Sequence, residues 1–325
     1  MSIPVKRWIN IMWRGQVEGD INSWDPLSKY LVMTRAVIDI ITVISVLIAG
    51  LLAALSNNFE LIPFLLCLFG MLLAHSGADL LNDYFDYKNG LDSKSYFRAQ
   101  YMPHPILDGL VSERGLINMI IIHYVIAATF AAYLAMIRGP LIVVFTLLGI
   151  FFGYAYQAGP KLKYIALGEI STFIVWGPLM VGGSYFAITG SLDLNVFLIS
   201  IPYALMVMLI LFGKHIDKYE SDKKLGVKTL PVVIGIENAK KVSIFIGLLS
   251  YIFIMIFIVL RLLPLTTSII FLTIPFYFAF SKYYLSHEKK IWYVAASLWL
   301  NRFFGIFFVL GLLLALVLKN FGILL

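Results

Sequence analysis

Residues 82–92, NDYFDYKNGLD, place three aspartates and two asparagines at the end of a long apolar run. Carboxylates at the edge of a membrane are costly unless a positive charge neutralises them. Hard divalent cations prefer carboxylate and amide oxygens, and Mg²⁺ usually keeps waters and shares the phosphates of its substrate. Asn82, Asp83 and Asp86, with Asp92 from the following loop, match that ligand set. The sequence therefore predicts a Mg²⁺ site here.

The polar residues before this motif favour a site over a simple helix end. If the segment stays helical to Asp86, His75, Asp79, Asn82 and Asp83 fall with it on one arc of about 80–100°, because each residue turns about 100°. A polar stripe on an apolar helix faces the bundle interior or a water-filled cavity. A lone aspartate is more often a solvated helix end, but a helix end does not require the earlier polar residues. Taken alone, His75 is more often a hydrogen-bonded interior residue.

A second acidic cluster lies in GKHIDKYESDKKLGVKTLPVVIG, residues 213–235. Asp217, Glu220 and Asp222 alternate there with lysines, a mixture that suits a metal–diphosphate complex, since acids hold Mg²⁺ and lysines contact phosphate. The alternative is a self-paired solvent face, for example Lys218 with Asp222. Both clusters follow a predicted membrane span, so they could open on one cavity.

Composition identifies the class of protein that must position these clusters. The chain has 325 residues, of which 61% are hydrophobic and 13% charged, and its mean hydropathy is +0.90. Soluble domains are nearer half apolar and a quarter charged. Cys67 is the only cysteine, so the chain forms no internal disulfide. We expect an all-α polytopic membrane protein with nine spans near residues 34–55, 61–84, 116–136, 140–158, 168–188, 195–216, 241–261, 265–282 and 297–318.

Lysine and arginine predict the orientation. With the N-terminus in the cytoplasm, 21 of the 25 basic residues fall in cytoplasmic segments and three outside, and Arg302 lies within the last span. The predicted C-terminus is therefore outside and both acidic clusters are cytoplasmic. The formal charge of +7 then flanks a cell membrane, and we expect membrane lipid and no nucleic acid among the partners.

The N-terminal residues 1–33 predict an interfacial segment before a transmembrane domain of residues 34–325. Trp8, Trp13 and Trp24 alternate with basic residues, as in a helix that lies flat with rings down and charges out. The alternative is an ordinary juxtamembrane anchor, since tryptophan and basic residues prefer this depth. A cleavable signal peptide is not expected, because the stretch has no continuous apolar core.

The motifs resemble those of the UbiA superfamily of intramembrane prenyltransferases, whose first motif is NDxxD followed by a further Asp. GPKLKYIALGEI (159–170), WGPLMVGGSYF (176–186) and GVKTLPVVIG (226–235) resemble the branch that prenylates 1,4-dihydroxy-2-naphthoate for menaquinone. The resemblance implies nine helices in one bundle around a cavity that opens to the cytoplasm. The chain departs from the family in the second motif, where Asp217 and Asp222 are five apart instead of four.

The resemblance implies Mg²⁺-dependent transfer of a polyprenyl chain from its diphosphate to an aromatic acceptor, with two Mg²⁺ ions bridging the diphosphate. The most favoured acceptor is 1,4-dihydroxy-2-naphthoate; 4-hydroxybenzoate, a glycerol lipid and a tetrapyrrole are the alternatives. A cation-coupled transporter is the rival class, since intramembrane acids also mark ion pathways. It would more readily place charges near the midplane on several helices.

Under this reading the site residues take separate roles. Candidate bases for the acceptor are Asp79, Asp83, Glu169 and His75. Aromatic faces near the predicted depth could shelter an allylic cation, although packing is their commoner role: Tyr84, Phe85, Tyr154 and Tyr156. The predicted sets are Asp83, Asp86 and Lys161 for catalysis; Asn82, Asp83, Asp86, Asp92, Asp217 and Asp222 for metal; Lys161, Lys163, Lys218 and Arg98 for diphosphate; and Asp79, Tyr156, Asn301 and Arg302 for the acceptor.

Overall fold

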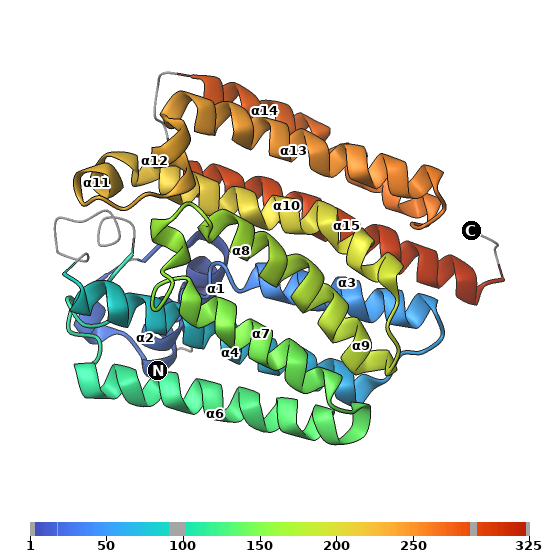
Figure 1. Cartoon of the computed structure of the whole chain (residues 1–325), viewed down its shortest axis with the longest axis horizontal. Helices are drawn as coiled ribbons and strands as arrows, with labels where there is room; N and C mark the ends of the chain where they lie inside the picture. Colours follow the sequence, from blue (N-terminus) through green and yellow to red (C-terminus); the bar gives the residue numbers. More distant parts are fainter. Residues whose placement is uncertain (1–3, 18, 91–101, 287–290, 323–325) are drawn as a thin grey trace.

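The structure, a computed structural model, describes residues 4–17, 19–90, 102–286 and 291–322. Over these residues the chain is helical and forms no β-strand; one isolated backbone bridge joins Ile165 to Lys228. The long helices lie side by side along the long axis of the molecule (Figure 1). The prediction of an all-α fold is confirmed.

The elements follow one another in an up-and-down order along the bundle (Figure 1). Their bounds are α1 Val5–Arg14, η1 Ile21–Ser23, α2 Pro26–Met33, α3 Ile40–Leu55, α4 Leu61–Lys88, α6 Glu113–Arg138, α7 Leu141–Ala155, η2 Leu162–Tyr164, α8 Gly168–Ile174, η3 Val175–Gly182, α9 Gly183–Thr189, α10 Leu194–Asp217, α11 Tyr219–Lys224, α12 Leu230–Ile234, α13 Ile236–Val259, η4 Leu265–Thr273, α14 Ile274–Leu285 and α15 Tyr293–Asn320.

Seven of the nine predicted spans are long and apolar enough to cross a membrane in the part of the chain described. The chain is therefore an integral membrane protein. The other two coincide with α3 and α7, which have 16 and 15 residues and are short of the roughly 20 that a bilayer needs. A count of nine spans thus stays a prediction.

One span is not a regular α-helix. Residues 168–189 run through α8, the π-helical segment η3 and α9. Pro178 lies inside η3 and has no N–H to donate to the preceding turn, which is the usual cause of a local break in helical hydrogen bonding. The hydroxyl of Ser45 on α3 donates to the carbonyl of Trp176 at 3.2 Å and so satisfies a backbone group in this region.

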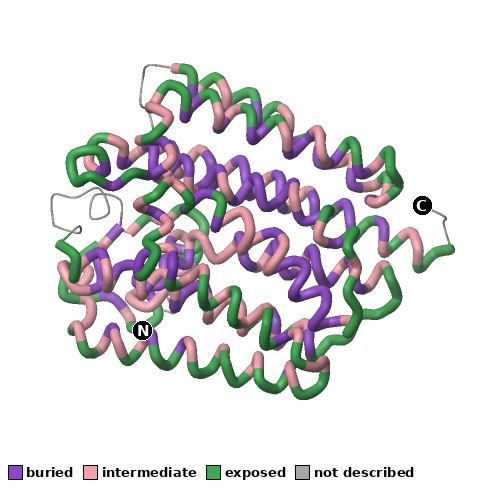
Figure 2. Tube along the Cα trace, in the orientation of Figure 1, coloured by how far each residue is buried: buried purple, intermediate pink, exposed green. Residues whose placement is uncertain are grey.

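The centre of the bundle is α10, which packs against α15, α13, η3 and α8. Its most apolar stretch is 72% buried, whereas that of α6 is only 17% buried. Figure 2 shows the same contrast, with α10 largely purple and α6 largely green and pink. The apolar side chains of α6 are exposed on the side that would meet lipid.

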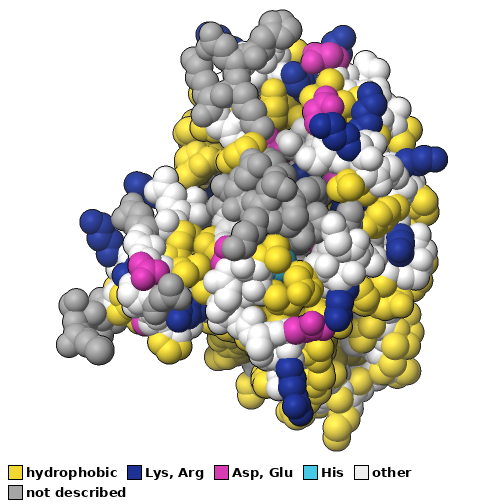
Figure 3. Space-filling view, turned by 90° about the vertical axis from the view of Figure 1, so that its left-hand side faces the viewer, with side chains coloured by type: hydrophobic (Ala, Val, Ile, Leu, Met, Phe, Trp, Pro, Cys, Tyr) yellow, Lys and Arg dark blue, Asp and Glu magenta, His cyan; other side chains and the backbone are white. Residues whose placement is uncertain are grey.

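The charged connections gather at one end of the bundle. The end of α4, the η2 turn, α11 and the start of α15 all lie toward the left of Figure 1, while α15 ends at the right. Viewed from that left side, basic and acidic side chains surround the end of the bundle (Figure 3). The loops predicted to be cytoplasmic therefore share one end; which membrane face this end occupies stays a prediction.

The N-terminal segment is helical and tied to the last helix. Arg302 of α15 donates to the carbonyls of Met12, Trp13 and Val37, and its guanidinium lies 5.0 Å from the Trp13 ring centre. These bonds hold the end of α1 against the transmembrane bundle. A flat position of residues 1–33 in the membrane interface remains a prediction.

Candidate active site

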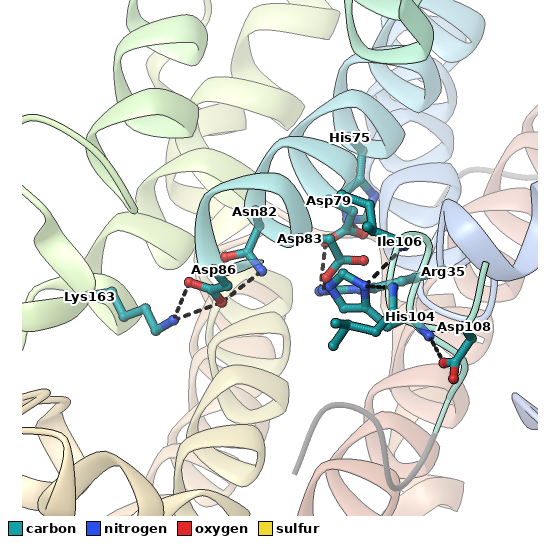
Figure 4. Close-up of polar contacts among 11 residues, drawn as sticks. Arg35, His75, Asp79, Asn82, Asp83, Asp86, His104, Ile106, Asp108 and Lys163 are labelled. Atoms are coloured by element: carbon teal, nitrogen blue, oxygen red, sulfur yellow. Dashed lines mark hydrogen bonds and ion pairs between the residues drawn. The ribbon is translucent and has the colours of Figure 1, made fainter. Parts of the chain in front are cut away.

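The acidic end of α4 points to two different basic partners. α4 is helical as far as Lys88, so the predicted polar stripe exists. Figure 4 shows Asp79 and Asp83 turned toward Arg35, and Asn82 and Asp86 turned toward Lys163. The stripe therefore splits into two pairs of side chains on neighbouring sides of one helix end.

Arg35 neutralises the first pair. Its Nη1 lies 3.2 Å from Asp79 Oδ1 and its Nη2 donates to Asp83 Oδ1, while the Asp83 side chain is fully buried. Arg35 stands between α2 and α3 with φ of 55°, a left-handed conformation that costs a non-glycine residue about 1 kcal/mol. Strain of this kind persists where surrounding contacts fix the residue, and here two carboxylates do so.

Lys163 neutralises the second pair from the η2 turn. Its Nζ lies 3.1 and 3.3 Å from the two Asp86 oxygens, and Asn82 Nδ2 donates to Asp86 Oδ2 at 3.4 Å. Burial alone would lower the pKa of Lys163, but the carboxylates of Asp86 and Asp222 outweigh it, so the pKa lies above its ordinary value. Lys163 is therefore a buried cation that two acidic elements share.

The second acidic cluster reaches the same place through Asp222. Its buried carboxylate lies 3.8 Å from Lys218 Nζ, and it interacts electrostatically with Lys163. Lys218 in turn interacts with Asp86 of α4. The backbone bridge between Ile165 and Lys228 ties the η2 loop to the loop after α11. The structure thus brings Asp86 and Asp222 to one group of lysines.

Asp217, the other candidate of the second motif, has a different partner. Its Oδ2 accepts a hydrogen bond from the backbone N–H of Val294 at 2.9 Å, in the first turn of α15. The first N–H groups of a helix have no partner within the helix, so this carboxylate caps α15. Glu220 is exposed. This arrangement favours Asp222 over Asp217 as the acid of the second cluster that faces the lysines.

A cavity of about 1650 Å³ begins beside these groups and continues between the helices. Its polar wall includes Arg35, His75, Asp79, Asn82 and Lys214. Its remaining walls are mostly apolar and come from α4, α6, α7 and η3, with further side chains of α3, α10 and α15. Pockets for large apolar ligands have this composition, with few polar groups at one end.

The oxygen atoms of Asn82 and Asp86 suit a hard cation whose other ligands come from substrate and water. Asn82 Oδ1 is buried without a hydrogen-bond partner, and it lies on the helix turn that carries Asp86. Over the described residues, no three His, Cys, Asp or Glu side chains are grouped closely enough to hold a metal by themselves. A metal here would therefore depend on oxygens from substrate and water, as Mg²⁺ sites commonly do.

A hydrogen-bonded row of three side chains reaches the cavity wall. Glu169 Oε1 lies 2.6 Å from His215 Nδ1, and His215 Nε2 lies 3.3 Å from the Tyr156 hydroxyl. Glu169 and His215 are fully buried, whereas Tyr156 lines the cavity. The row joins residues from α8, α10 and the end of α7.

Other predicted residues lie elsewhere. Lys161 is exposed, with Nζ 5.5 Å from the Tyr164 ring centre. Asn301 is buried and accepts from the Tyr203 hydroxyl at 3.4 Å. Neither Asn301 nor Arg302 lines the cavity, because Asn301 is paired within the core and Arg302 donates to three backbone carbonyls. Asp92 and Arg98 lie outside the described residues.

Sequence reasoning missed two residues of this region. Arg35 entered only as a positive charge that flanks the membrane, and His215 was not singled out, whereas Lys214 was among the lysines of the second acidic cluster. Two signals were available: Arg35 is a basic residue at the very start of a predicted span, and His215 precedes Asp217 of the second acidic motif by two positions. Their partners could not be read from the chain, since Asp83 and Glu169 are 48 and 46 residues away.

Comparison with known proteins decides the family. The profile of the UbiA prenyltransferase family matches residues 42–304. The chain belongs to this family. It is therefore a prenyltransferase, and the rival class of transporter is set aside.

This prenyltransferase has curated relatives that match along most of their length. It is 28% identical over 283 residues to the 1,4-dihydroxy-2-naphthoate octaprenyltransferase of Bacillus subtilis (strain 168), covering 84% of this chain and 88% of the relative. It is 26% identical over 253 residues to the human UbiA prenyltransferase domain-containing protein 1, covering 77% and 72%.

Solved structures share the fold of this prenyltransferase. The UbiA homologue from Archaeoglobus fulgidus bound to DMAPP and Mg²⁺ is 18% identical with a TM-score of 0.62, over 89% of this chain and 99% of that one. The apo UbiA homologue from Aeropyrum pernix K1 is also 18% identical, with a TM-score of 0.65 over 84% and 97%. At this identity the likeness establishes the fold of the chain.

Proposed function

We propose that this prenyltransferase transfers a polyprenyl chain from its diphosphate to 1,4-dihydroxy-2-naphthoate, with Mg²⁺, in menaquinone biosynthesis. The observation that carries the proposal is the group formed by Asp86, Lys163 and Asp222 beside the polar end of a large apolar cavity. The relative from Bacillus subtilis is named for this acceptor. The relative from Archaeoglobus fulgidus is described with a prenyl diphosphate and Mg²⁺.

The diphosphate belongs at the charged end of the cavity. Lys214 lines the cavity there, and Lys163, Lys214 and Lys218 all interact electrostatically with Asp86. Lysine ammonium groups contact phosphate as point charges, and their effect is larger in a site of low dielectric than in water. A diphosphate that enters would exchange the ion pairs of these lysines for contacts with its own oxygens. Lys161 is exposed, so Lys163 takes the place of Lys161 in the proposed catalytic set.

Asn82, Asp86 and Asp222 would hold Mg²⁺ together with diphosphate oxygens and water. A bound Mg²⁺ neutralises the charge that develops on the leaving diphosphate. Asp83 is covered by Arg35, so we place it in support of Arg35 and not on the metal. The acids and lysines of the chain keep the diphosphate at one end while the carbon–oxygen bond breaks and its electrons leave with the diphosphate.

The prenyl tail fits the apolar walls that α4, α6, α7 and η3 provide. These walls exclude water from the allylic carbon. A ring carbon of the acceptor forms the new bond to this carbon, and the proton that the ring carbon carried passes to the base. Tyr154 lines the cavity and is a candidate to face the allylic carbon with its ring. Tyr84 and Phe85 pack edge to face on each other.

The acceptor is proposed to lie against Arg35, His75, Asp79 and Tyr156. Arg35 is a buried guanidinium in the cavity wall, and guanidinium groups match the planar carboxylate of a naphthoate. Of the four candidate bases, Asp79 and His75 line the cavity, whereas Asp83 and Glu169 do not. We therefore narrow the proposed base to Asp79 or His75, whose Oδ2 and Nε2 are 3.6 Å apart.

The test incubates the purified protein with geranylgeranyl diphosphate, Mg²⁺ and a panel of acceptors, with product identification by mass. We expect the prenylated naphthoate as the main product and no product after chelation of the metal. Prenylation of 4-hydroxybenzoate, a glycerol lipid or a tetrapyrrole in place of the naphthoate would overturn the acceptor and leave the transferase activity intact.

A further inference from the structure

One hydrogen bond at the cavity wall, between the Tyr156 hydroxyl and His215, has its direction fixed by a buried row that continues to Glu169. Two of its members are fully buried, and none of the groups proposed for the metal or diphosphate belongs to it. A buried hydrogen-bonded row that ends on a ligand-facing hydroxyl is placed to orient that hydroxyl.

The carboxylate of Glu169 determines which nitrogen of a neutral His215 carries the proton. A carboxylate only accepts hydrogen bonds, and Glu169 Oε1 lies 2.6 Å from Nδ1, so Nδ1 carries the hydrogen. Nε2 is then an acceptor. The partner of Nε2 is the Tyr156 hydroxyl at 3.3 Å. With the neutral ring in this tautomer, the hydroxyl is the donor and gives its only proton to Nε2.

This direction leaves the Tyr156 oxygen with lone pairs toward the cavity. Diphosphate oxygens are acceptors too, so an oxygen whose proton is engaged elsewhere gives them no hydrogen bond. A hydroxyl group of an aromatic acceptor is a donor and matches it. The direction of the hydrogen bonds in the row therefore favours a hydroxyl of the aromatic acceptor, and not a diphosphate oxygen, as the partner of the Tyr156 oxygen.

Close packing around Gly168 holds the side chains of the row in place. A Cβ on Gly168 would lie 3.1 Å from Tyr156 Cε2 and 3.7 Å from His215 Cε1. A side chain here would crowd the Tyr156 ring, which would have to move by a few tenths of an ångström, whereas its distance to His215 is an ordinary contact. Glu169 is the next residue, so the backbone that accommodates the rings also places the carboxylate.

We propose that His215 and Glu169 are positioning residues that turn Tyr156 into a hydrogen-bond acceptor for a free hydroxyl of the aromatic substrate. The inference rests on the proposed function and adds a specificity rule to it. An acceptor whose hydroxyl at this position is methylated cannot donate, so the enzyme should reject it.

A second tyrosine–histidine pair supplies a matched control. The Tyr30 hydroxyl lies 2.9 Å from His123 Nε2, and His123 Nδ1 lies 2.7 Å from the carbonyl of Met119. The chemistry is the same, but neither Tyr30 nor His123 lines the cavity. Tyr30→Phe and His123→Asn therefore disturb an equivalent hydrogen bond away from the substrates.

The experiment compares the dihydroxynaphthoate with its two monomethyl ethers in the full-length enzyme. Wild type should prefer the free hydroxyl over one of the ethers by at least about 10-fold in kcat/KM, since a hydrogen-bonding site rejects an analogue that lacks its donor. Tyr156→Phe should raise the acceptor KM about 10-fold and abolish the preference, with the KM of the prenyl diphosphate changed by less than about 2-fold.

His215 variants separate positioning from folding. Asn can keep a donor near Glu169 but does not reach Tyr156, so His215→Asn should lose most of the preference. Gln can place a polar atom near the former Nε2, so His215→Gln should restore part of it. In the Tyr156→Phe background His215→Asn should add less than about a 2-fold effect, because both act through one hydroxyl.

Three results would overturn the inference while the proposed function stands. Wild type could use both ethers as well as the free dihydroxynaphthoate, the two substitutions could have additive effects, or Tyr30→Phe and His123→Asn could cause an equal loss of preference. If no aromatic acceptor is prenylated at all, the proposed function fails first and the specificity rule fails with it.

Discussion

The two ends of the helical bundle both contain basic side chains, but these have different partners. At the far end, Arg138 donates to the carbonyls of Ala187 and Ile188 at 2.9 and 2.8 Å, and Lys319 donates to the carbonyl of Leu55 at 2.6 Å. These carbonyls lie in the last turns of α9 and α3, where backbone acceptors lack partners. The cations at the far end cap helices, and the one carboxylate described here beside them, Glu60 next to Arg138, is exposed.

At the charged end, the cations face carboxylates. Arg35 binds two acids of α4, and Lys163 binds Asp86 and also interacts with Asp222 of α11. Capping does not require such partners, and buried charges are costly to maintain. The difference shows that a basic residue at a helix end marks a site when acids from distant parts of the chain converge on it.

The largest difference between the ends should appear on removal of an acid. Asp86→Ala should lower kcat/KM for prenyl transfer by about 100- to 1000-fold, because it removes an electrostatic partner of the leaving diphosphate. Asp193→Asn, which alters the cap of α10 at the far end, should lower it by less than about 2-fold. Similar losses in the two variants would contradict the comparison.

The two aspartates of the second acidic motif should affect different properties of the enzyme, Asp222 its activity and Asp217 its stability. Asp222→Asn should lower activity about 30- to 100-fold. Asp217→Asn should leave activity within about 3-fold and lower the unfolding free energy by about 1 kcal/mol, since it weakens a helix cap. Steady-state kinetics and thermal unfolding in detergent measure the two effects. The assignment is wrong if Asp217→Asn has the larger kinetic effect.

The lysines at the two ends should differ in substrate binding. Lys163→Met should raise the KM of the prenyl diphosphate about 10-fold, because charge-assisted contacts to phosphate contribute about 1.5–3 kcal/mol. Lys319→Met should leave that KM unchanged. Titration of both variants with the same prenyl diphosphate checks this, and a KM shift in Lys319→Met alone would reverse the roles of the ends.

The smallest effect is expected at the exposed ion pair of the far end. Glu60 is about half exposed beside Arg138, and exposed pairs contribute about 0–1 kcal/mol. Glu60→Gln should therefore lower the unfolding free energy by no more than about 1 kcal/mol and leave kinetics unchanged. A clear kinetic defect in this variant would mean that the far end also takes part in the reaction.

The positions of the spans could be predicted because hydrophobic runs and turn residues are local properties of the chain. The polar stripe of α4 followed in the same way from helical periodicity. The partners of these residues could not be predicted, since Arg35 and Lys163 meet α4 only through the packing of the bundle. The sequence could not divide the roles of the second motif for a related reason: Asp217 and Asp222 differ in which neighbour each meets, and only the fold sets that.

The central claim is that Asp86 and Asp222 act together on one metal-bound diphosphate. Calorimetric titration of a non-hydrolysable prenyl diphosphate, with and without Mg²⁺, tests it in wild type, Asp86→Asn, Asp222→Asn and the double variant. We predict that binding requires Mg²⁺, that each single substitution weakens it at least about 10-fold, and that the double variant is little weaker than either one. Additive losses, or binding that does not depend on Mg²⁺, would contradict the account.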